Sequence, residues 1–415
     1  MSTLPFDIIA EIIDAVGEAE DTNLLKELAL VSHCFHQICS KHLFATIELH
    51  DAYPRYVASS KKGFVKLLKS RPDVVKHVRK LIYKVENVHI NADGESDDHL
   101  LSPILPNFLR TISGLNYLAI NASYLDWNKL DSSLTSAFLH LMRLPTINHI
   151  DLSSIQNFPL SSLTSPVNLH RLDISSIGRI PSFEEEIVVQ SEMMPKIREF
   201  HIEDSPLMTT KLLRAKLQDR RPAFNFTDLR QLSICCFKQY QNIRYLLQNA
   251  SAKSLEKLHL TLESGRSLLR LRDILSPRAR TLKALDLTTL IFEPHFDHLP
   301  PFKGICEELE ALAGNNILEG LSFEIELCVD DDGIKCHGGI ESLIQNVEKV
   351  LVKPGWSALR RVSFKVPILC CSIVPQYSAG LSETLQSLLV LPDKYLSHFT
   401  KLKPIAFSFS SYIVH

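Results

Sequence analysis

The chain has 415 residues, of which 45% are hydrophobic and 22% are charged, and its formal net charge is −2 at pH 7. This composition is typical of a folded globular protein, and the balanced charge provides no positive field that would attract a nucleic acid. The N-terminus lacks the segments of a signal peptide, and the longest nearly unbroken apolar stretch, residues 366–375, is too short to span a bilayer. The nine cysteines have no regular spacing and indicate reduced thiols. We therefore expect a cytoplasmic or nuclear protein with neither a membrane nor a nucleic-acid partner.

Residues 1–50 predict three short helices. Thr3 can cap the first helix, which opens at Leu4-Pro5 because proline is tolerated in a first turn. The apolar residues of this helix cover a wider arc than one buried face requires, and they are Phe6, Ile8, Ile9, Ile12, Ile13 and Val16. A second helix carries Leu24, Leu25, Leu28 and Leu30, and a third runs from about residue 32 to residue 44. A module this small buries too little surface to be stable alone, so its spare apolar side chains are expected to pack on the rest of the chain or to bind a partner.

The order of short motifs in this module resembles an F-box. The motifs are Leu4-Pro5, Ile8 and Ile12, Leu28-x-Leu30-Val31-Ser32, an aromatic residue at Phe35, where the family commonly has Trp, and His42-Leu43-Phe44. The continuation over residues 64–81 is similar to a linker of F-box proteins from mushroom-forming fungi. In that family the module binds the Skp adaptor, which docks on the cullin of a ubiquitin ligase. The resemblance implies that the adaptor contacts are Leu4, Pro5, Ile8, Ile12, Leu30, Val31 and Phe35.

One phrase, aliphatic-x-x-aliphatic-x-aliphatic, recurs along the rest of the chain. Its copies begin at Leu115, Ile147, Leu169, Ile197, Leu229, Leu255, Leu282, Leu318 and Leu359. Helical stretches are expected between copies, at residues 209–217, 241–247, 268–275 and 340–350. A short strand followed by a helix, repeated in this way, is typical of a leucine-rich-repeat solenoid with parallel strands inside and helices outside. A doubly wound α/β sheet is the alternative.

The repeats depart from the leucine-rich family pattern in their turns. The family usually has Asn or Cys eight positions after the first Leu, where this chain has Ile155, Ile177, Ser205, Phe237, Glu263, Leu290 and Glu326. We therefore expect irregular turns, and surface insertions at residues 91–98 and 294–301. The expected fold class is α/β, with an F-box-like module at 1–50, a helical linker at 51–76 and an irregular leucine-rich-repeat-like solenoid at 77–415.

In such strands the fourth and sixth residues of the phrase point inward, and the third and fifth point to the concave surface. The candidate substrate-binding residues in these two columns are Tyr117, His149, Asp151, Arg171, Asp173, Glu199, His201, Lys257, His259, Asp286 and Arg361. The alternative interpretation is a solvated face with partly compensating charges. Mixed charge suits a protein or peptide better than a phosphate group.

Three of these side chains, Asp151, Asp173 and His201, are expected to form a contiguous polar strip, because adjacent strands lie about 4.8 Å apart. Such a strip can in principle support acid–base chemistry or bind a cation. However, an open sheet face excludes little water, and no nucleophile motif or glycine-rich loop accompanies it. The cluster of Cys and His residues at 33–42 also lacks convergent zinc-ligand geometry on one helix. We therefore expect no catalytic residue, no metal, no cofactor and no enzymatic activity.

Three functional hypotheses remain. The first is a substrate-recognition subunit of a Skp–cullin–F-box ligase, in which the front helices bind the adaptor and the solenoid binds a target protein. The second is a repeat scaffold for protein–protein interaction without a ligase, in which the front helices only cap the solenoid. The third is a hydrolase on the polar strip, which requires a cleft that the sequence does not indicate. The first two differ in whether residues 1–50 expose or protect their apolar face.

Overall fold

The computed structural model describes residues 5–19, 21–51, 70–85, 104–178, 188–189, 194–217, 219–235, 254–263, 275, 280–292, 301–329, 337–370, 386, 388, 390 and 405–414. The chain is α/β, and its main strands are parallel to their neighbours. It divides into two units, one of residues 1–197 and 207–225 and the other of residues 198–206 and 226–415. Each unit contains its own set of adjacent parallel strands, so the units are described in turn.

The first unit begins with three helices, as the sequence predicts. These are α1 (Phe6–Glu18), α2 (Thr22–Ala29) and α3 (His33–Leu43). The side chain of Asp21 caps α2 by accepting a hydrogen bond from the Leu24 amide at 3.0 Å, and Ser32 caps α3 in the same way. The first helix starts at Phe6, with Pro5 as its N-cap residue, rather than at Leu4-Pro5. The expected cap, Thr3, lies outside the described residues.

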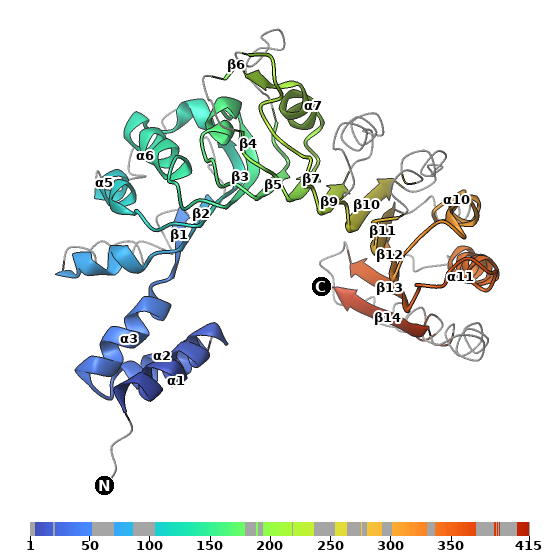
Figure 1. Cartoon of the computed structure of the whole chain (residues 1–415), viewed down its shortest axis with the longest axis horizontal. Coiled ribbons are helices and arrows are strands. Elements are labelled where there is room, and N and C mark those ends of the chain that lie inside the picture. Colours follow the sequence, from blue (N-terminus) through green and yellow to red (C-terminus); the bar gives the residue numbers. More distant parts are fainter. Residues whose placement is uncertain are drawn as a thin grey trace. The chain divides into compact units, whose positions relative to one another are not determined.

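Five parallel strands follow, and their order in the sheet is their order in the chain. They are β1 (Thr46–Asp51), β2 (Lys80–Val85), β3 (Tyr117–Asp126), β4 (His149–Gln156) and β5 (Arg171–Ser175). Figure 1 shows α5 (Ile104–Thr111) and α6 (Ser132–Met142) on one face of these strands. Helix α7 (Pro206–Arg214), the two-residue strands β6 (Val188–Val189) and β8 (Lys216–Leu217), and the short 3-10 helices η1 (Pro72–His77), η2 (Trp127–Lys129) and η3 (Leu160–Thr164) complete the described elements.

The second unit contains seven parallel strands, again in chain order. They are β7 (Glu199–Glu203), β9 (Gln231–Cys235), β10 (Lys257–Glu263), β11 (Ala284–Phe292), β12 (Gly320–Val329), β13 (Arg361–Cys370) and β14 (Ala406–Val414). Helices α10 (Ile305–Leu312) and α11 (His337–Leu351) lie on one side of the later strands (Figure 1). A doubly wound sheet reverses its strand order at a switch point. Neither unit contains such a reversal among its described strands, so the doubly wound alternative fails within each unit.

Every copy of the repeated phrase forms a strand that begins at the third residue of the phrase. In β4, for example, Ile150 and Leu152 are buried while His149 and Asp151 on the opposite face are only partly covered. The phrases are held in register by a shared carbonyl: the amides of Asn148 and His149 donate to the Asn116 carbonyl oxygen at 3.0 and 3.1 Å. The same two-donor pattern recurs at other strands of each unit. The phrase therefore fixes which residues lie on the face opposite the helices, which we call the open face.

The connections differ more from the expectation. Residues 340–350 are helical within α11, but 216–217 form β8 instead of ending a helix. The expected helix at 241–247 and most of that at 268–275 lie outside the described residues, as do the insertion at 91–98, most of that at 294–301 and most of the linker. Where the family has Asn in the turn, Ile155 and Ile177 are buried, and left-handed backbone occurs at Asn157 and Ser176, with φ of 55° and 51°. Small polar residues tolerate this conformation best among non-glycine residues.

Candidate functional site

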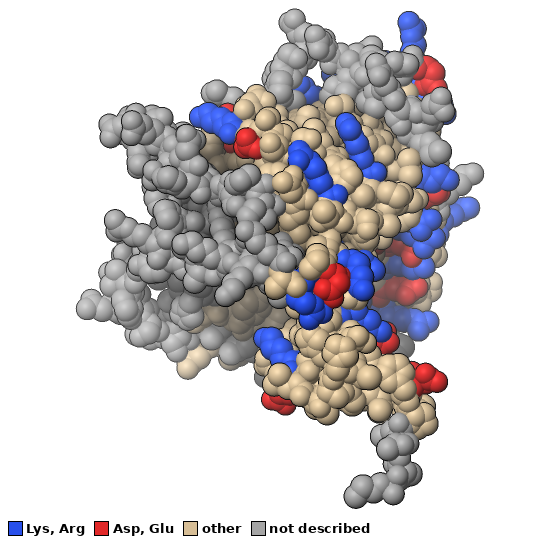
Figure 2. Space-filling model, turned by 90° about the vertical axis from the view of Figure 1, so that its left-hand side faces the viewer, with Lys and Arg blue, Asp and Glu red and all other residues tan. Residues whose placement is uncertain are grey.

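The three-helix module exposes an unusual number of large apolar side chains. Thirteen such side chains are exposed among the described residues, and six of them belong to this short module: Phe6, Ile8, Ile12, Leu24, Leu30 and Val31. Leu30 and Val31, in the turn between α2 and α3, are 87% and 64% exposed. In Figure 2 the module, at the bottom of the view, presents a largely uncharged surface. Exposed apolar side chains gathered in this way are common at surfaces that take part in protein–protein contacts.

The module also has a small core of its own, which fixes the orientation of the exposed residues. Its fully buried side chains are Ile13, Leu25, Ile38 and Cys39, and Val16 and Phe35 are among those that pack partly against them. Helices α1 and α3 approach closely at Gly17, where an added Cβ would lie 2.2 Å from the His42 ring.

An ion pair and a histidine–carboxylate contact connect the same two helices. Lys41 and His42 of α3 contact the Asp14 carboxylate of α1 at 2.6 and 2.8 Å. The hydrogen bond from Lys41, followed by that from His42, lowers the pKa of Asp14. The Asp14 carboxylate therefore stays ionised further into the acidic range than an unpaired aspartate would.

The structure places most of the expected adaptor-binding residues on the surface. Pro5, Ile8, Ile12, Leu30 and Val31 are exposed. Phe35 differs, because its side chain is half-buried and packs against the core of the module. Leu4 lies outside the described residues. Phe6 and Leu24 are also exposed, but they were not among the expected contacts. Both belong to apolar sets noted in the sequence, the wide apolar arc of the first helix and the leucines of the second.

On the open face of the first unit, the candidate substrate residues form a connected network. His149 Nε2 lies 2.9 Å from Asp173 Oδ2, and Arg171 contacts the same carboxylate at 3.0 Å. The hydroxyl of Tyr117 donates to Asp151 Oδ2 at 3.1 Å, and its ring meets the His149 ring edge-on with centroids 4.4 Å apart. This network joins β3, β4 and β5 through the third and fifth residues of each phrase.

The electrostatics of this network follow from burial and pairing. Burial acts to raise the pKa of Asp173, but the hydrogen bonds from His149 and Arg171 outweigh it, and the pKa is lowered. Burial, followed by the charge of Asp151, raises the pKa of Tyr117. Tyr117 therefore remains a neutral hydrogen-bond donor at physiological pH. Lys80 of β2 adds a cation 4.7 Å from the centroid of the same ring.

The open face of the second unit carries the remaining candidates in a looser arrangement. Lys257 Nζ lies 3.4 Å from Asp286 Oδ2, and His259 Nε2 lies 3.2 Å from Thr261 Oγ1. Burial lowers the pKa of His259, although the Asp286 charge opposes this effect. Arg361 is exposed at the start of β13.

The expected strip of Asp151, Asp173 and His201 divides between the two units. Asp151 and Asp173 are register partners in β4 and β5. His201 belongs to β7 of the second unit, where it is in register with Ser233, and Glu199 occupies the start of the same strand. The contiguous strip is therefore present only for its first two members within one unit.

The described residues contain no group of three His, Cys, Asp or Glu side chains arranged to hold a metal ion. The arrangement on both open faces is one of hydroxyl, imidazole and paired charged groups that can bind a polar surface. It resembles neither an enclosed pocket nor an activated nucleophile with its base.

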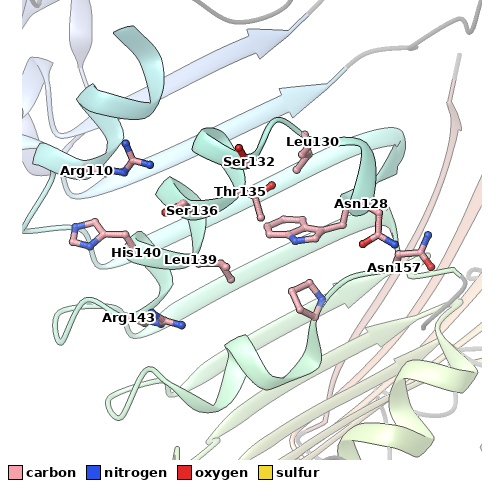
Figure 3. Close-up of a pocket in the computed structure, with 12 residues that line it drawn as sticks. Arg110, Asn128, Leu130, Ser132, Thr135, Ser136, Leu139, His140, Arg143 and Asn157 are labelled. Carbon is pink, nitrogen blue, oxygen red and sulfur yellow. The ribbon is translucent and has the colours of Figure 1, made fainter. Parts of the chain in front are cut away.

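The sequence predicted no site on the layer of helices, but a groove lies there. It runs along the outer face of α6 in the first unit and has a volume of about 880 Å³ (Figure 3). Its walls come from α5, η2 and the residues that follow β4. The groove could have been predicted from the sequence of α6, because the polar residues of this helix share one face.

No model of a known protein family matches this sequence, and no curated protein is significantly similar to it. Among the described helices, none combines the length and the apolar character needed to cross a bilayer.

Proposed function

We propose that this chain is a non-enzymatic substrate-recognition subunit of a Skp–cullin–F-box ubiquitin ligase. In this role the three-helix module binds a Skp-family adaptor, which joins the chain to a cullin, and an irregular leucine-rich-repeat-like solenoid binds a target protein. The chain would act by proximity, raising the effective concentration of a target lysine near an enzyme carried by another subunit. Such a role belongs to the cytoplasm or the nucleus.

The observation that carries the proposal is the set of exposed apolar side chains on the module. A helical module that only capped the repeats would bury these side chains against its neighbours, whereas Ile8, Ile12, Leu30 and Val31 are exposed. The order of motifs that resembles an F-box supplies the kind of partner. The strands, parallel and in chain order within each unit, with the same phrase at the start of nine of them, support the solenoid.

The network of paired side chains on the open face of the first unit supports a protein as the target. Tyr117, His149 and Arg171 present aromatic, imidazole and guanidinium groups side by side, which are groups that protein interfaces use repeatedly. The opposite signs of Arg171 and Asp173 suit a partner with mixed charge.

The alternative is a repeat scaffold for protein–protein interaction that joins no ligase. It is favoured by the attachment of the module to the sheet: α3 leads almost directly into β1, and Arg71 beside η1 contacts His36 of α3 at 3.1 Å. A cap on the first strand of a repeat array would be attached in this way.

Co-expression with a Skp-family protein of a mushroom-forming fungus tests the proposal. We expect the two proteins to co-elute in size-exclusion chromatography, and the double variant Leu30→Glu with Val31→Glu to abolish the complex while leaving the chain folded. Val352→Glu is the matched control, because Val352 is an exposed aliphatic residue outside the module. A folded chain that never co-elutes with the adaptor would refute the ligase role and leave the scaffold.

A further inference from the structure

The groove along α6 is built from one face of that helix and two flanking walls. Ser132, Ser136, His140 and Arg143 recur at helical spacing on the outer face of α6 and line the groove. The opposite face of α6 is buried, so the helix cannot turn to close the groove. Arg110 of α5 forms one wall, and the other contains η2 and Pro159.

Positive charge gathers at one end of the groove. Arg110, His140 and Arg143 lie together there, whereas Asn128 and Asn157 lie at the other end (Figure 3). None of the described residues that line the groove carries a carboxylate. Its two arginines therefore give the lining a net positive charge, in a chain whose overall charge is slightly negative.

The two arginines have no carboxylate partner among the described residues. Arg110 donates to the Ser133 carbonyl oxygen at 3.1 Å, a contact that positions its guanidinium group without neutralising it. Arg143 forms no ion pair within the described part of the chain, in contrast to Arg71 and Arg171, which pair with Asp73 and Asp173. Guanidinium groups without a counter-charge are well suited to bind carboxylates.

The rest of the lining suits a peptide chain rather than a free anion. Leu130, Leu139 and Pro159 provide apolar contact beside Trp127. Asn157 donates to Asp126 Oδ1 at 2.8 Å, which fixes its amide group in the groove. Asparagine side chains can donate to and accept from a peptide backbone at the same time.

The groove is also formed before any ligand binds. Trp127 packs edge-on against Phe158, with ring centroids 5.0 Å apart, and against Phe138 of α6 at 6.2 Å. Asp131 caps the first turn of α6 by accepting from the amides of Ser133 and Leu134. A rigid groove loses little conformational entropy on binding.

We propose that this groove binds an extended acidic segment of a partner protein. Carboxylates of the segment would contact Arg110 and Arg143, an apolar side chain would cover Leu139 and Pro159, and its backbone would bind the asparagine amides. This is a second protein-binding surface, on the helical layer of the first unit. It is independent of the adaptor and of the ligase role.

The test uses the full chain and the fact that it has two tryptophans. Trp127 is largely buried, at 4% exposed, and lines the groove, whereas Trp356 is buried in the second unit and lines a different cavity. A Trp356→Phe background therefore makes Trp127 the only fluorescent tryptophan. The probe is an octapeptide of alternating Glu and Leu, and the comparison probes are the matching Lys and Leu octapeptide and a short single-stranded oligonucleotide.

We expect the acidic peptide to change Trp127 emission saturably and the basic peptide to have no effect. Arg110→Gln with Arg143→Gln should weaken binding about tenfold at low salt, since two exposed charge pairs are lost. Ser136→Tyr should block the groove without changing its charge, and Arg360→Gln, an exposed arginine of the second unit, should leave binding unchanged. Circular dichroism confirms that each variant is folded.

Two results would overturn the proposal. One is an acidic peptide that binds no better than the basic one, or whose binding ignores both the arginine and the Ser136 substitutions. The other is an oligonucleotide that binds with the expected dependence on the arginines while the peptide does not, which would identify the groove as a nucleic-acid surface.

Discussion

Two consecutive isoleucines of α1 provide the sharpest test of how the module is oriented. Ile12 is 52% exposed, whereas Ile13 is 1% exposed and belongs to the module's core. The substitutions Ile12→Ala and Ile13→Ala remove the same atoms from adjacent positions of one helix. Any difference between them therefore comes from the environment of each side chain and not from helix propensity.

The two substitutions are expected to affect different quantities, folding stability for Ile13→Ala and adaptor binding for Ile12→Ala. Ile13→Ala should cost about 2–5 kcal/mol of folding free energy, because it removes buried groups and leaves a cavity in a core with only four fully buried side chains. Ile12→Ala should change stability by less than about 0.5 kcal/mol. Its effect should instead be on adaptor binding. The substitution removes three apolar groups, each contributing about 0.8 kcal/mol when fully buried, and about half of their surface is exposed before binding. The expected loss of binding free energy is therefore about 1.2 kcal/mol, or roughly an eightfold weaker Kd.

Hydrogen exchange measured by mass spectrometry over residues 6–43 separates the two effects, together with calorimetric titration of the adaptor. Ile13→Ala should accelerate exchange throughout the module, since small cores open as a unit, while Ile12→Ala should leave exchange unchanged. Equal loss of protection in both variants would show that the assignment of inner and outer faces is wrong. An adaptor that binds the Ile12→Ala chain with unchanged affinity would remove Ile12 from the proposed contact.

Three further predictions concern one residue of the first unit and two of the second. The folded-state pKa of Asp173 is lowered from its usual 3.8. Its pairing therefore stabilises the chain above that pH, and this stabilisation is lost as the pH falls through the lower, folded-state value. In the Asp173→Asn variant, the free energy of unfolding should depend less on pH in this acidic range. Phe364→Ala should cost about 3–5 kcal/mol in urea unfolding, since the ring is buried and stacks on Phe323 at 4.8 Å. Gly355→Ala should lower the thermal midpoint more than Gly314→Ala. Both glycines have positive φ, but only at Gly355 would a Cβ meet backbone, at 2.5 Å from the Gly314 nitrogen.

The sequence predicted nine strands correctly because each has an identical pattern of buried positions. Among the described residues, three strands of the parallel array were missed where that pattern is altered, and the two-residue strands β6 and β8 were missed as well. Phe44 replaces the first aliphatic residue before β1, Tyr83 replaces the last in β2, and Pro404 stands at the first position before β14. Tyr83 is buried like the aliphatic residues it replaces and packs on Phe138 at 5.1 Å. A strand position requires a buried apolar group of suitable size, so a search limited to aliphatic residues loses such copies.

Helices α5, α6 and α10 were not predicted, because the connections share no phrase from one repeat to the next. For α6 the local signal was present. Asp131 is a good N-cap residue, and Leu134, Phe138 and Leu141 follow at helical spacing and are buried. The other face of the same helix carries mainly polar residues together with Leu139, and it contributes to the groove.

The open-face residues were predictable as a set but not as a network. Alternation along a strand places Tyr117, His149 and Asp173 on one face. It does not specify that His149 contacts Asp173 rather than Asp151, because that choice depends on side-chain conformations across neighbouring strands. His201 lies on β7 of the second unit, so within the first unit the strip contains Asp151 and Asp173 alone.

The repeat explains why the two kinds of surface differ. A strand phrase with invariant buried positions leaves its third and fifth residues free to vary, so each strand adds independent side chains to the open face, and a binding surface there can be altered one residue at a time. The helical layer has no such register. A groove forms on it where residues of one helix lie near the outward polar face of another, as Arg110 of α5 and Ser136 of α6 do in lining the same groove. Substitutions on the open face should therefore change affinity locally, whereas a change in the length of the connection between α5 and α6 should remove the groove altogether.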